Sequence, residues 1–206
     1  MKSRKEITTN SYNKTAEEYR RVVSEFNLLP ELFEYEDLIK KKGKILDLGC
    51  GPGHHSKYFC DMGHEVVGID LSQRMIELAR KTAPKASFEV MDISDLSFPP
   101  KTFEGVWASA SLLHIPKLEI RAVLKNLYRI LKAGGIFYIS LKKGNSEEFL
   151  EDDRYDGVEK FYAYYMPIEI ETILIEQGFS ILKKRIRGKR PSYDTNSWIH
   201  IFCIKN

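Results

Sequence analysis

The residues best placed to do chemistry begin with three glycines at alternate positions, Gly49, Gly51 and Gly53, directly after the apolar run 45–48. Glycine accepts a positive φ and has no Cβ, so its backbone can touch a ligand. The polar residues from His54 onward are typical of a helix start, whose free N–H groups attract a carboxylate or a phosphate. The pattern predicts a strand, a tight loop and a helix that cradle a ligand at the carboxyl end of a first strand.

Two carboxylates follow at the ends of later apolar runs. Asp70 lies 21 positions after Gly49, where an acidic side chain can accept hydrogen bonds from both hydroxyls of a ribose. Asp92 ends the next run and could hold the exocyclic amine of a base. We therefore expect an adenosine-type ligand across the loop. The dinucleotide fingerprint would need glycine where His54 stands, so a nicotinamide cofactor is only weakly indicated.

Strands and helices in alternation must bring these residues to one edge of a sheet. Apolar spacing and end signals predict helices at 15–26 (opened by a capping box at Thr15), 32–42, 54–62, after Ser72, 116–133 and from Pro167 to Gly178. Apolar runs predict strands at 44–48, 65–70, 87–92, 103–111, 135–141, 180–187 and 198–205. The order predicts an α/β fold: a doubly wound, seven-stranded, mostly parallel sheet with helices on both faces and an antiparallel last strand.

Length and composition narrow the class of protein. The 206 residues fit one domain, and a net charge of +3 with well-mixed signs does not by itself indicate nucleic acid. No apolar run approaches the roughly 20 residues of a membrane span, and the first ten residues lack the apolar core of a signal peptide. We expect a soluble, cytoplasmic protein. Neither a disulfide framework nor a metal site is expected from these residues: Cys50, Cys60, Cys203, His54, His55 and His64.

Five segments, in this order and spacing, resemble the class I S-adenosylmethionine-dependent methyltransferases, in particular the small type 11-like enzymes: DLGCGPG, GIDLS, MDISDL, FEGVWASASLLHIP and LKAGGIFYIS. The resemblance extends from Tyr12 to the carboxyl terminus. It implies a Rossmann-like methyltransferase fold. It also implies S-adenosyl-L-methionine as cofactor and S-adenosyl-L-homocysteine as product.

The resemblance implies a set of cofactor-binding residues: Tyr12, Tyr19, Asp47, Gly49, Cys50, Gly51, Gly53, Asp70, Leu71, Asp92, Ile93 and Ser109. In this set the glycine loop with Asp47 holds the methionine moiety, directly or through the shape of the loop, and Ser109 contacts its end. Asp70 takes the ribose. Leu71, Asp92 and Ile93 contact the adenine, and the two tyrosines resemble a pattern that lids the cofactor. An alternative role for Asp47 is structural, capping N–H groups of the loop, and Tyr19 could belong to the core.

His114 is the candidate general base, because the loop after the fourth strand borders the transferred methyl in this fold. A base is needed only when the acceptor is a poorly ionised hydroxyl or ammonium group. The alternative is a structural histidine at the start of a helix, bonded to a nearby carbonyl.

The chain divides into a segment that covers the site and a core that contains a candidate lid. Residues 1–43 are expected to cover the cofactor site, and residues 44–206 to form the methyltransferase core of the same single domain. Within that core, the acidic and aromatic segment 142–166 is a candidate substrate lid, with a surface helix as the alternative.

The leading hypothesis is an enzyme that transfers a methyl group from S-adenosylmethionine to O, N or C of a small-molecule acceptor. One alternative is an RNA methyltransferase that uses the basic stretch 183–190, which could equally be a solvated hairpin. Another is a cofactor-binding subunit without catalysis. The fourth strand ends in WASASL rather than Asn/Asp-Pro-Pro-Tyr/Phe, which disfavours amino-methylation of DNA bases.

Overall fold

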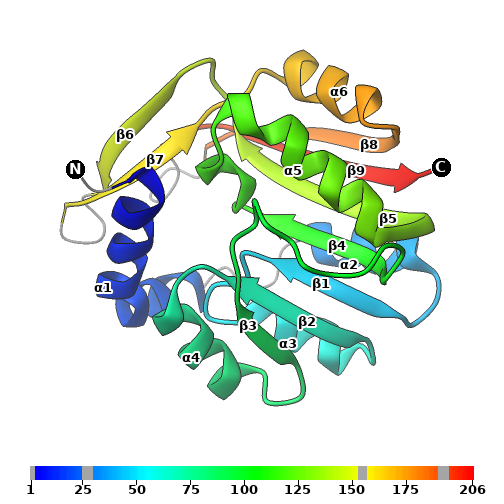
Figure 1. Ribbon diagram of the computed structural model, residues 1–206, viewed down its shortest axis with the longest axis horizontal. Helices are drawn as coiled ribbons and strands as arrows, with labels where there is room; N and C mark the ends of the chain where they lie inside the picture. Colours follow the sequence, from blue (N-terminus) through cyan, green and yellow to red (C-terminus); the bar gives the residue numbers. More distant parts are fainter. Residues whose placement is uncertain (1–2, 25–29, 153–156, 190–194) are drawn as a thin grey trace.

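A computed structural model describes residues 3–24, 30–152, 157–189 and 195–206 (Figure 1). Its main sheet has the strand order β3-β2-β1-β4-β5-β9-β8. The strands are β1 (Lys44–Leu48), β2 (Glu65–Asp70), β3 (Ser87–Val90), β4 (Phe103–Ser109), β5 (Leu131–Lys142), β8 (Phe179–Arg187) and β9 (Trp198–Lys205). Strands β1 to β5 pair in parallel, whereas β9 runs antiparallel to both β5 and β8. The predicted fold class is confirmed.

Helices cover both faces of this sheet, as Figure 1 shows. They are α1 (Arg4–Ser24), α2 (Pro30–Ile39), α3 (His54–Asp61), α4 (Gln73–Thr82), the 3₁₀ turn η1 (Leu112–His114), α5 (Lys117–Ile130) and α6 (Pro167–Glu176). Successive side chains of a strand face opposite sides. In β1, Ile45 accordingly packs with residues of α2 and α3, and Leu46 packs in the larger core with residues of α5 and α6.

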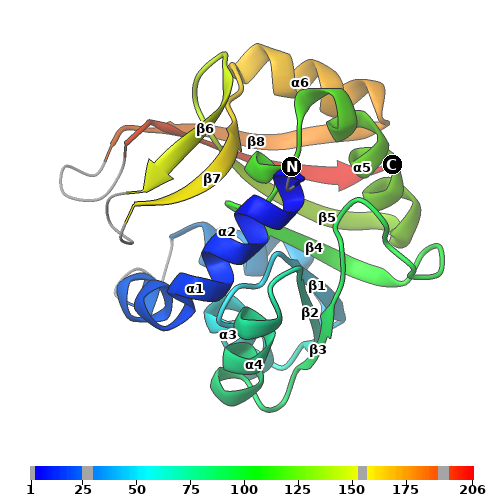
Figure 2. The same ribbon diagram turned by 60° about the vertical axis from the view of Figure 1, so that its left-hand side comes forward.

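The first helix is longer than the sequence pattern predicts. It begins at Arg4 rather than at Thr15, which is buried in the middle of α1 and donates a hydrogen bond to the Ser11 carbonyl at 2.9 Å. The predicted capping box is therefore wrong. The early turns have weak helix propensity, but they pack against the β6–β7 hairpin described below (Figure 2). Tertiary contacts override the local signal. The predicted helix end at position 26 lies outside the described residues.

Other predicted boundaries shift by a few residues. Helix α2 ends at Ile39, because Lys40 adopts a positive φ of 57°, and not at position 42. Strands β3 and β4 each end two residues early. Helix α5 ends at Ile130 and β5 begins at Leu131, which pairs with Phe103 of β4 across a register shift. The prediction that helix α5 continues to the paired glycines at 134–135 is therefore wrong.

The segment 142–166 contains a hairpin, and the alternative of a surface helix is wrong for its described part. Strands β6 (Glu147–Asp152) and β7 (Val158–Ala163) pair antiparallel as a separate two-stranded sheet. Strand β7 packs against α1 and η1, and α1 also packs against α4. Figure 2 shows α1 between the hairpin and α4, next to the ends of the central strands. No described helix is long and apolar enough to cross a membrane.

Candidate cofactor site

A pocket lies where β1, β2 and β4 end, with α1 as one wall. Ten of the residues expected in the site line it: Tyr12, Tyr19, Gly49, Gly51, Asp70, Leu71, Asp92, Ile93, Ser109 and His114. Asp47, Cys50 and Gly53 do not line it. The structure thus brings together groups from positions 12 to 114 of the chain.

The glycine loop turns sharply, with positive φ at Gly49 (73°), Gly51 (52°) and Gly53 (85°). A Cβ on Gly49 would lie 2.4 Å from the Cβ of Ser111, and one on Gly53 would lie 2.9 Å from the Cα of Ala79. These two glycines are required by close packing. At Gly51 the nearest atom would be a Tyr19 ring carbon at 3.8 Å, so this glycine borders open space in the pocket. Its backbone can approach a ligand, as predicted for a cradle.

Asp70 anchors the loop and presents a carboxylate to the pocket. Its Oδ2 accepts a hydrogen bond from the Gly51 N–H at 3.0 Å, and its Oδ1 accepts one from the Ser72 N–H at 2.8 Å. Burial raises the pKa of Asp70, and these backbone bonds oppose that rise. The Leu71 N–H also bonds this carboxylate, and the part of Asp70 that lines the pocket suits a hydroxyl of a sugar.

At the other end of the pocket, Asp92 is already paired. Its Oδ2 accepts a hydrogen bond from Lys5 Nζ at 2.7 Å and its Oδ1 one from the Ser94 N–H at 2.8 Å. Burial favours a higher pKa, but the bonds from Lys5 and Ser94 outweigh it, and the pKa of Asp92 lies below its usual value. The exocyclic amine of a nucleobase at this position would share the Asp92 carboxylate with Lys5.

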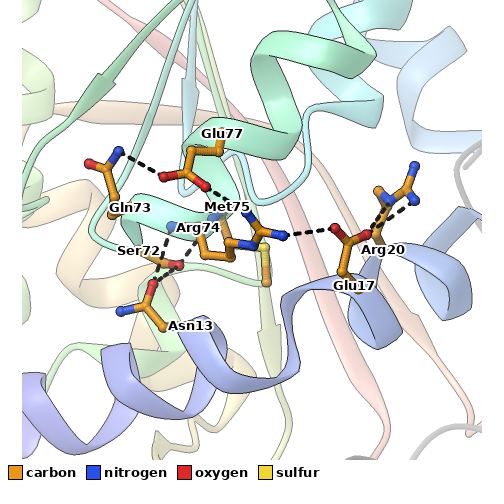
Figure 3. A network of polar contacts seen from close by, with 8 residues as sticks. All are labelled: Asn13, Glu17, Arg20, Ser72, Gln73, Arg74, Met75 and Glu77. Atoms are coloured by element: carbon orange, nitrogen blue, oxygen red, sulfur yellow. Dashed lines mark hydrogen bonds and ion pairs between the residues drawn. The ribbon is translucent and has the colours of Figure 1, made fainter.

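Helix α1 is fastened to the start of α4 by a polar network (Figure 3). Asn13 Oδ1 accepts hydrogen bonds from Ser72 Oγ at 2.7 Å and from the Arg74 N–H at 3.2 Å, while Ser72 Oγ caps α4 by accepting from the Met75 N–H at 3.1 Å. Arg74 also pairs with Glu17 at 3.1 Å. The predicted cap at Ser72 is confirmed. The network holds α1 over the side of the pocket that Asp70 and Ser72 line.

His114 is held in one tautomer. Its Nδ1 lies 2.6 Å from the carbonyl oxygen of Phe161, which can only accept, so Nδ1 carries the proton. The other nitrogen, Nε2, then accepts the hydrogen bond of the Tyr12 hydroxyl at 2.8 Å. Burial lowers the pKa of His114 to about 3; the Phe161 bond opposes this, and Lys160 and Lys142 add to it. The geometry matches the structural alternative, since both nitrogens are occupied.

The three expected residues that miss the pocket have contacts elsewhere. The buried Asp47 accepts a hydrogen bond from Ser56 Oγ of α3 at 2.6 Å, and burial raises its pKa to about 7 against that bond. Cys50 is buried in a small cluster with residues of α4, where burial raises the pKa of its thiol. Gly53 is the N-cap of α3. All three therefore stabilise the loop through contacts outside the pocket.

The pocket also contains residues that the sequence pattern did not single out. They are Lys5, Thr8, Thr9, Ser72, Met75, Ala110, Ser111 and Ile115. The residues from the first turns of α1 were missed because the predicted helix began too late. Ala110 has a positive φ of 54°, and this conformation of a residue other than glycine is not readable from the sequence.

Comparisons with known proteins agree with the fold. Residues 45–135 match the family model described as a methyltransferase domain. An uncharacterized methyltransferase of Synechocystis sp. is 33% identical over 94 residues, covering 46% of this chain and 44% of the relative. The sterol 24-C-methyltransferase of Aspergillus fumigatus is 35% identical over 128 residues, covering 58% and 31%. The chain spans less than half the length of these curated relatives.

Among solved structures, the 1,6-didemethyltoxoflavin-N1-methyltransferase of Burkholderia thailandensis aligns with a TM-score of 0.78 at 18% identity, covering 100% of this chain and 92% of that one. Such a likeness shows the fold. With the strand order and the matched domain, it identifies a Rossmann-like methyltransferase fold. Residues 45–135, which contain the glycine loop, are similar to a methyltransferase domain.

Proposed function

We propose that this protein is an enzyme that transfers the methyl group of S-adenosyl-L-methionine to O, N or C of a small-molecule acceptor. The observation that carries the proposal is the line of groups across adjacent strand ends, with Asp92 after β3, Asp70 as the last residue of β2 and the glycine loop after β1. The open face of Gly51 and the Asp70 carboxylate that lines the pocket fit such a ligand.

When bound, the cofactor would supply an electrophilic methyl on a sulfonium. The chain then has to align and enclose the reactants, because in-line displacement needs little further chemistry. In this proposal Asp70 holds the ribose and Asp92 the adenine, while Tyr12 and Tyr19 cover the ligand. The two tyrosine rings meet edge to face at 5.5 Å and line the pocket with electron-rich surface, which favours a cation.

We propose that His114 acts through Tyr12 rather than as a free general base. A neutral imidazole with a pKa of about 3 is a poor proton acceptor at neutral pH. Its bond from the Tyr12 hydroxyl instead fixes that phenol in the pocket. The acceptor we favour therefore has an atom that is nucleophilic without a strong base, such as a carboxylate, a neutral amine or an activated carbon.

The β6–β7 hairpin packs against α1, which forms one wall of the pocket. The β6–β7 hairpin borders α1 through a hydrogen bond from the Phe161 N–H to Thr8 Oγ1 at 3.1 Å and a bond from Ser11 Oγ to the Glu159 carbonyl at 2.5 Å. We propose that residues 1–43 cover the cofactor and that the hairpin forms the acceptor lid, as parts of one domain. By their printed names, one relative is a sterol 24-C-methyltransferase and one structural neighbour a 1,6-didemethyltoxoflavin-N1-methyltransferase, so we leave both C and N open as the atom that accepts the methyl group.

The RNA alternative gains little support from the basic stretch 183–190. Three of its side chains form ion pairs within the protein: Lys184 with Glu171 at 2.7 Å, Arg185 with Glu34 at 2.6 Å and Arg187 with Glu31 at 2.7 Å. Its last residue lies outside the described residues. Three free thiols, at Cys50, Cys60 and Cys203, favour a reducing compartment, and we propose the cytoplasm.

Turnover tests the proposal. The protein is incubated with methyl-labelled S-adenosylmethionine and fractions of a metabolite extract, with the D70N variant as control. We expect label to appear in a low-molecular-weight product and to drop at least about tenfold in D70N, because Asp70 would lose its charged bonds to the sugar. Binding of the cofactor without any transfer would support the non-catalytic alternative. Label confined to RNA would support the alternative of an RNA methyltransferase.

A further inference from the structure

Two lysines are buried where the β6–β7 hairpin meets the end of β5. Lys142, the last residue of β5, is 6% exposed, and Lys160 of β7 is 1% exposed. Lysine is rarely buried, because its ammonium group loses its hydration and its charge must be compensated by neighbouring groups. Two buried ammonium groups make a positive environment that favours an anion nearby.

Both ammonium groups lie over aromatic rings that surround His114. Lys142 Nζ lies 3.9 Å from the centroid of the Tyr162 ring, and Lys160 Nζ lies 4.7 Å from that of the Tyr12 ring. The His114 ring packs between these tyrosines, with centroid distances of 5.1 Å to Tyr162 and 5.5 Å to Tyr12. Because Tyr12 and His114 line the pocket, each charge lies one or two rings behind the pocket wall. Both charges also lower the pKa of His114, so they act on a group inside that wall.

The polar contacts of the two lysines differ in charge. Lys160 Nζ forms an ion pair with Asp152 Oδ2 at 3.2 Å. Lys142 Nζ donates a hydrogen bond to the neutral Thr195 Oγ1 at 3.3 Å. A bond to a charged oxygen is stronger than a bond to a hydroxyl. Lys142 is therefore the better placed of the two lysines to bind an anion.

The strand order places Lys142 next to the groups that we assign to the cofactor. Strand β4 follows β1 in the sheet, and β5 follows β4. Ser109 at the end of β4 lines the pocket and pairs with Ser140, two residues before Lys142. The hairpin returns to the same point, since the Tyr165 N–H donates to the Lys142 carbonyl at 3.1 Å. With the cofactor along the ends of β1 to β3, the acceptor falls at the ends of β4 and β5.

We propose that the methyl acceptor is a net anion, whose carboxylate or phosphate binds the Lys142 ammonium group between the end of β5 and the β6–β7 hairpin. This inference rests on the proposed function and names the class of acceptor. Lys142 donates a charge-assisted hydrogen bond to the anion, and Lys160 adds positive potential at the same place.

Fractionation of the acceptor tests its charge. A metabolite extract is passed over an anion-exchange resin at pH 8, and the retained and unretained fractions are each incubated with the protein and methyl-labelled S-adenosylmethionine. We expect labelled product from the retained fraction alone. Phosphatase treatment of that fraction separates the two kinds of anion: transfer is lost for a phosphate monoester and persists for a carboxylate.

Variants of Lys142 test the residue. At a fixed, subsaturating amount of the retained fraction, we expect K142M to lower the rate of transfer about tenfold or more and K142R to lower it less, because arginine keeps the charge. The affinity of K142M for S-adenosylhomocysteine in titration calorimetry should be unchanged, because Lys142 does not line the cofactor pocket. The exposed Lys125 of α5 gives the matched control K125M, which should change neither quantity.

The contrary results are distinguishable. Transfer confined to the unretained fraction overturns the anionic acceptor, and equal rates for wild type and K142M remove Lys142 from acceptor binding; the proposed function stands in both cases. A K142M variant that loses affinity for S-adenosylhomocysteine as much as it loses rate shows a structural lysine and also overturns the assignment. Absence of transfer from every fraction overturns the proposed function itself.

Discussion

His114 shows how the surroundings of one residue change its chemistry. From its type and place after a strand, a histidine near neutrality could act as a base. In the fold its Nδ1–H is bound by the Phe161 carbonyl, and burial holds its pKa at about 3. What remains is a neutral acceptor for the hydrogen bond of Tyr12. In the proposed function His114 therefore acts by positioning the hydroxyl of Tyr12 and not as a base.

This protonation state makes stability depend on pH. An unfolded histidine titrates near pH 6.5, whereas the folded one resists protonation down to about pH 3. The folded state therefore binds fewer protons in this window, and the contribution of His114 is complete above pH 6.5 and lost as the pH falls. We expect the stability advantage of wild type over H114Q in urea unfolding to shrink by about 1–2 kcal/mol between pH 8 and pH 5. An advantage of equal size at both values would mean that folding does not lower the pKa of His114.

Helix α1 connects the base end of the pocket to the rest of the molecule. Its first turn contributes Lys5 to Asp92, and its middle contributes Asn13 to the start of α4. In the proposed function the amine of the adenine would use the Asp92 oxygen that Lys5 holds, so α1 would both cover the pocket and compete with the ligand. A partly exposed ion pair of this kind contributes at most about 1 kcal/mol.

Removing that competitor should tighten binding. We expect K5M to bind S-adenosylhomocysteine up to about fivefold more tightly, because Asp92 would no longer share its Oδ2 with a lysine. Lys14, which is exposed on the same helix, gives the control variant K14M. Weaker binding by K5M in titration calorimetry would instead show that Lys5 contacts the ligand.

Elements coded by local residues were predictable, and those that depend on distant contacts were not. The run from β1 through the glycine loop to α3 carries its own apolar, glycine and polar signals, and its position was predicted within a residue. The early turns of α1 and the β6–β7 hairpin are stabilised by each other, as the bond between Thr8 and Phe161 illustrates. Neither segment shows that partnership in its own sequence.

The same distinction holds in the site. The meeting of Asp70 and Gly51 in the pocket could be predicted, because only one loop, one helix and one strand separate them along the chain. Lys5 and Ser111 enter the pocket through an unpredicted helix start and a left-handed alanine. The side-chain types alone do not indicate either position.

At the scale of the whole molecule, the order of the strands is what makes one ligand site. Strands β2 and β3 lie on one side of β1 in the sheet, and β4 lies on the other side. All of them run parallel to β1, so their carboxyl ends lie at the same edge. Groups as distant in sequence as Tyr12 and His114 then face a single pocket closed by α1. The central claim is that an adenosyl ligand spans this edge with its sugar at Asp70.

Titration of S-adenosylhomocysteine into the wild type and D70N tests that claim most directly, with D61N at an exposed aspartate as control. The account predicts a dissociation constant in the micromolar range or tighter for the wild type and D61N, and binding weaker by about tenfold or more for D70N. No heat of binding in the wild type, or identical binding by D70N, would contradict it.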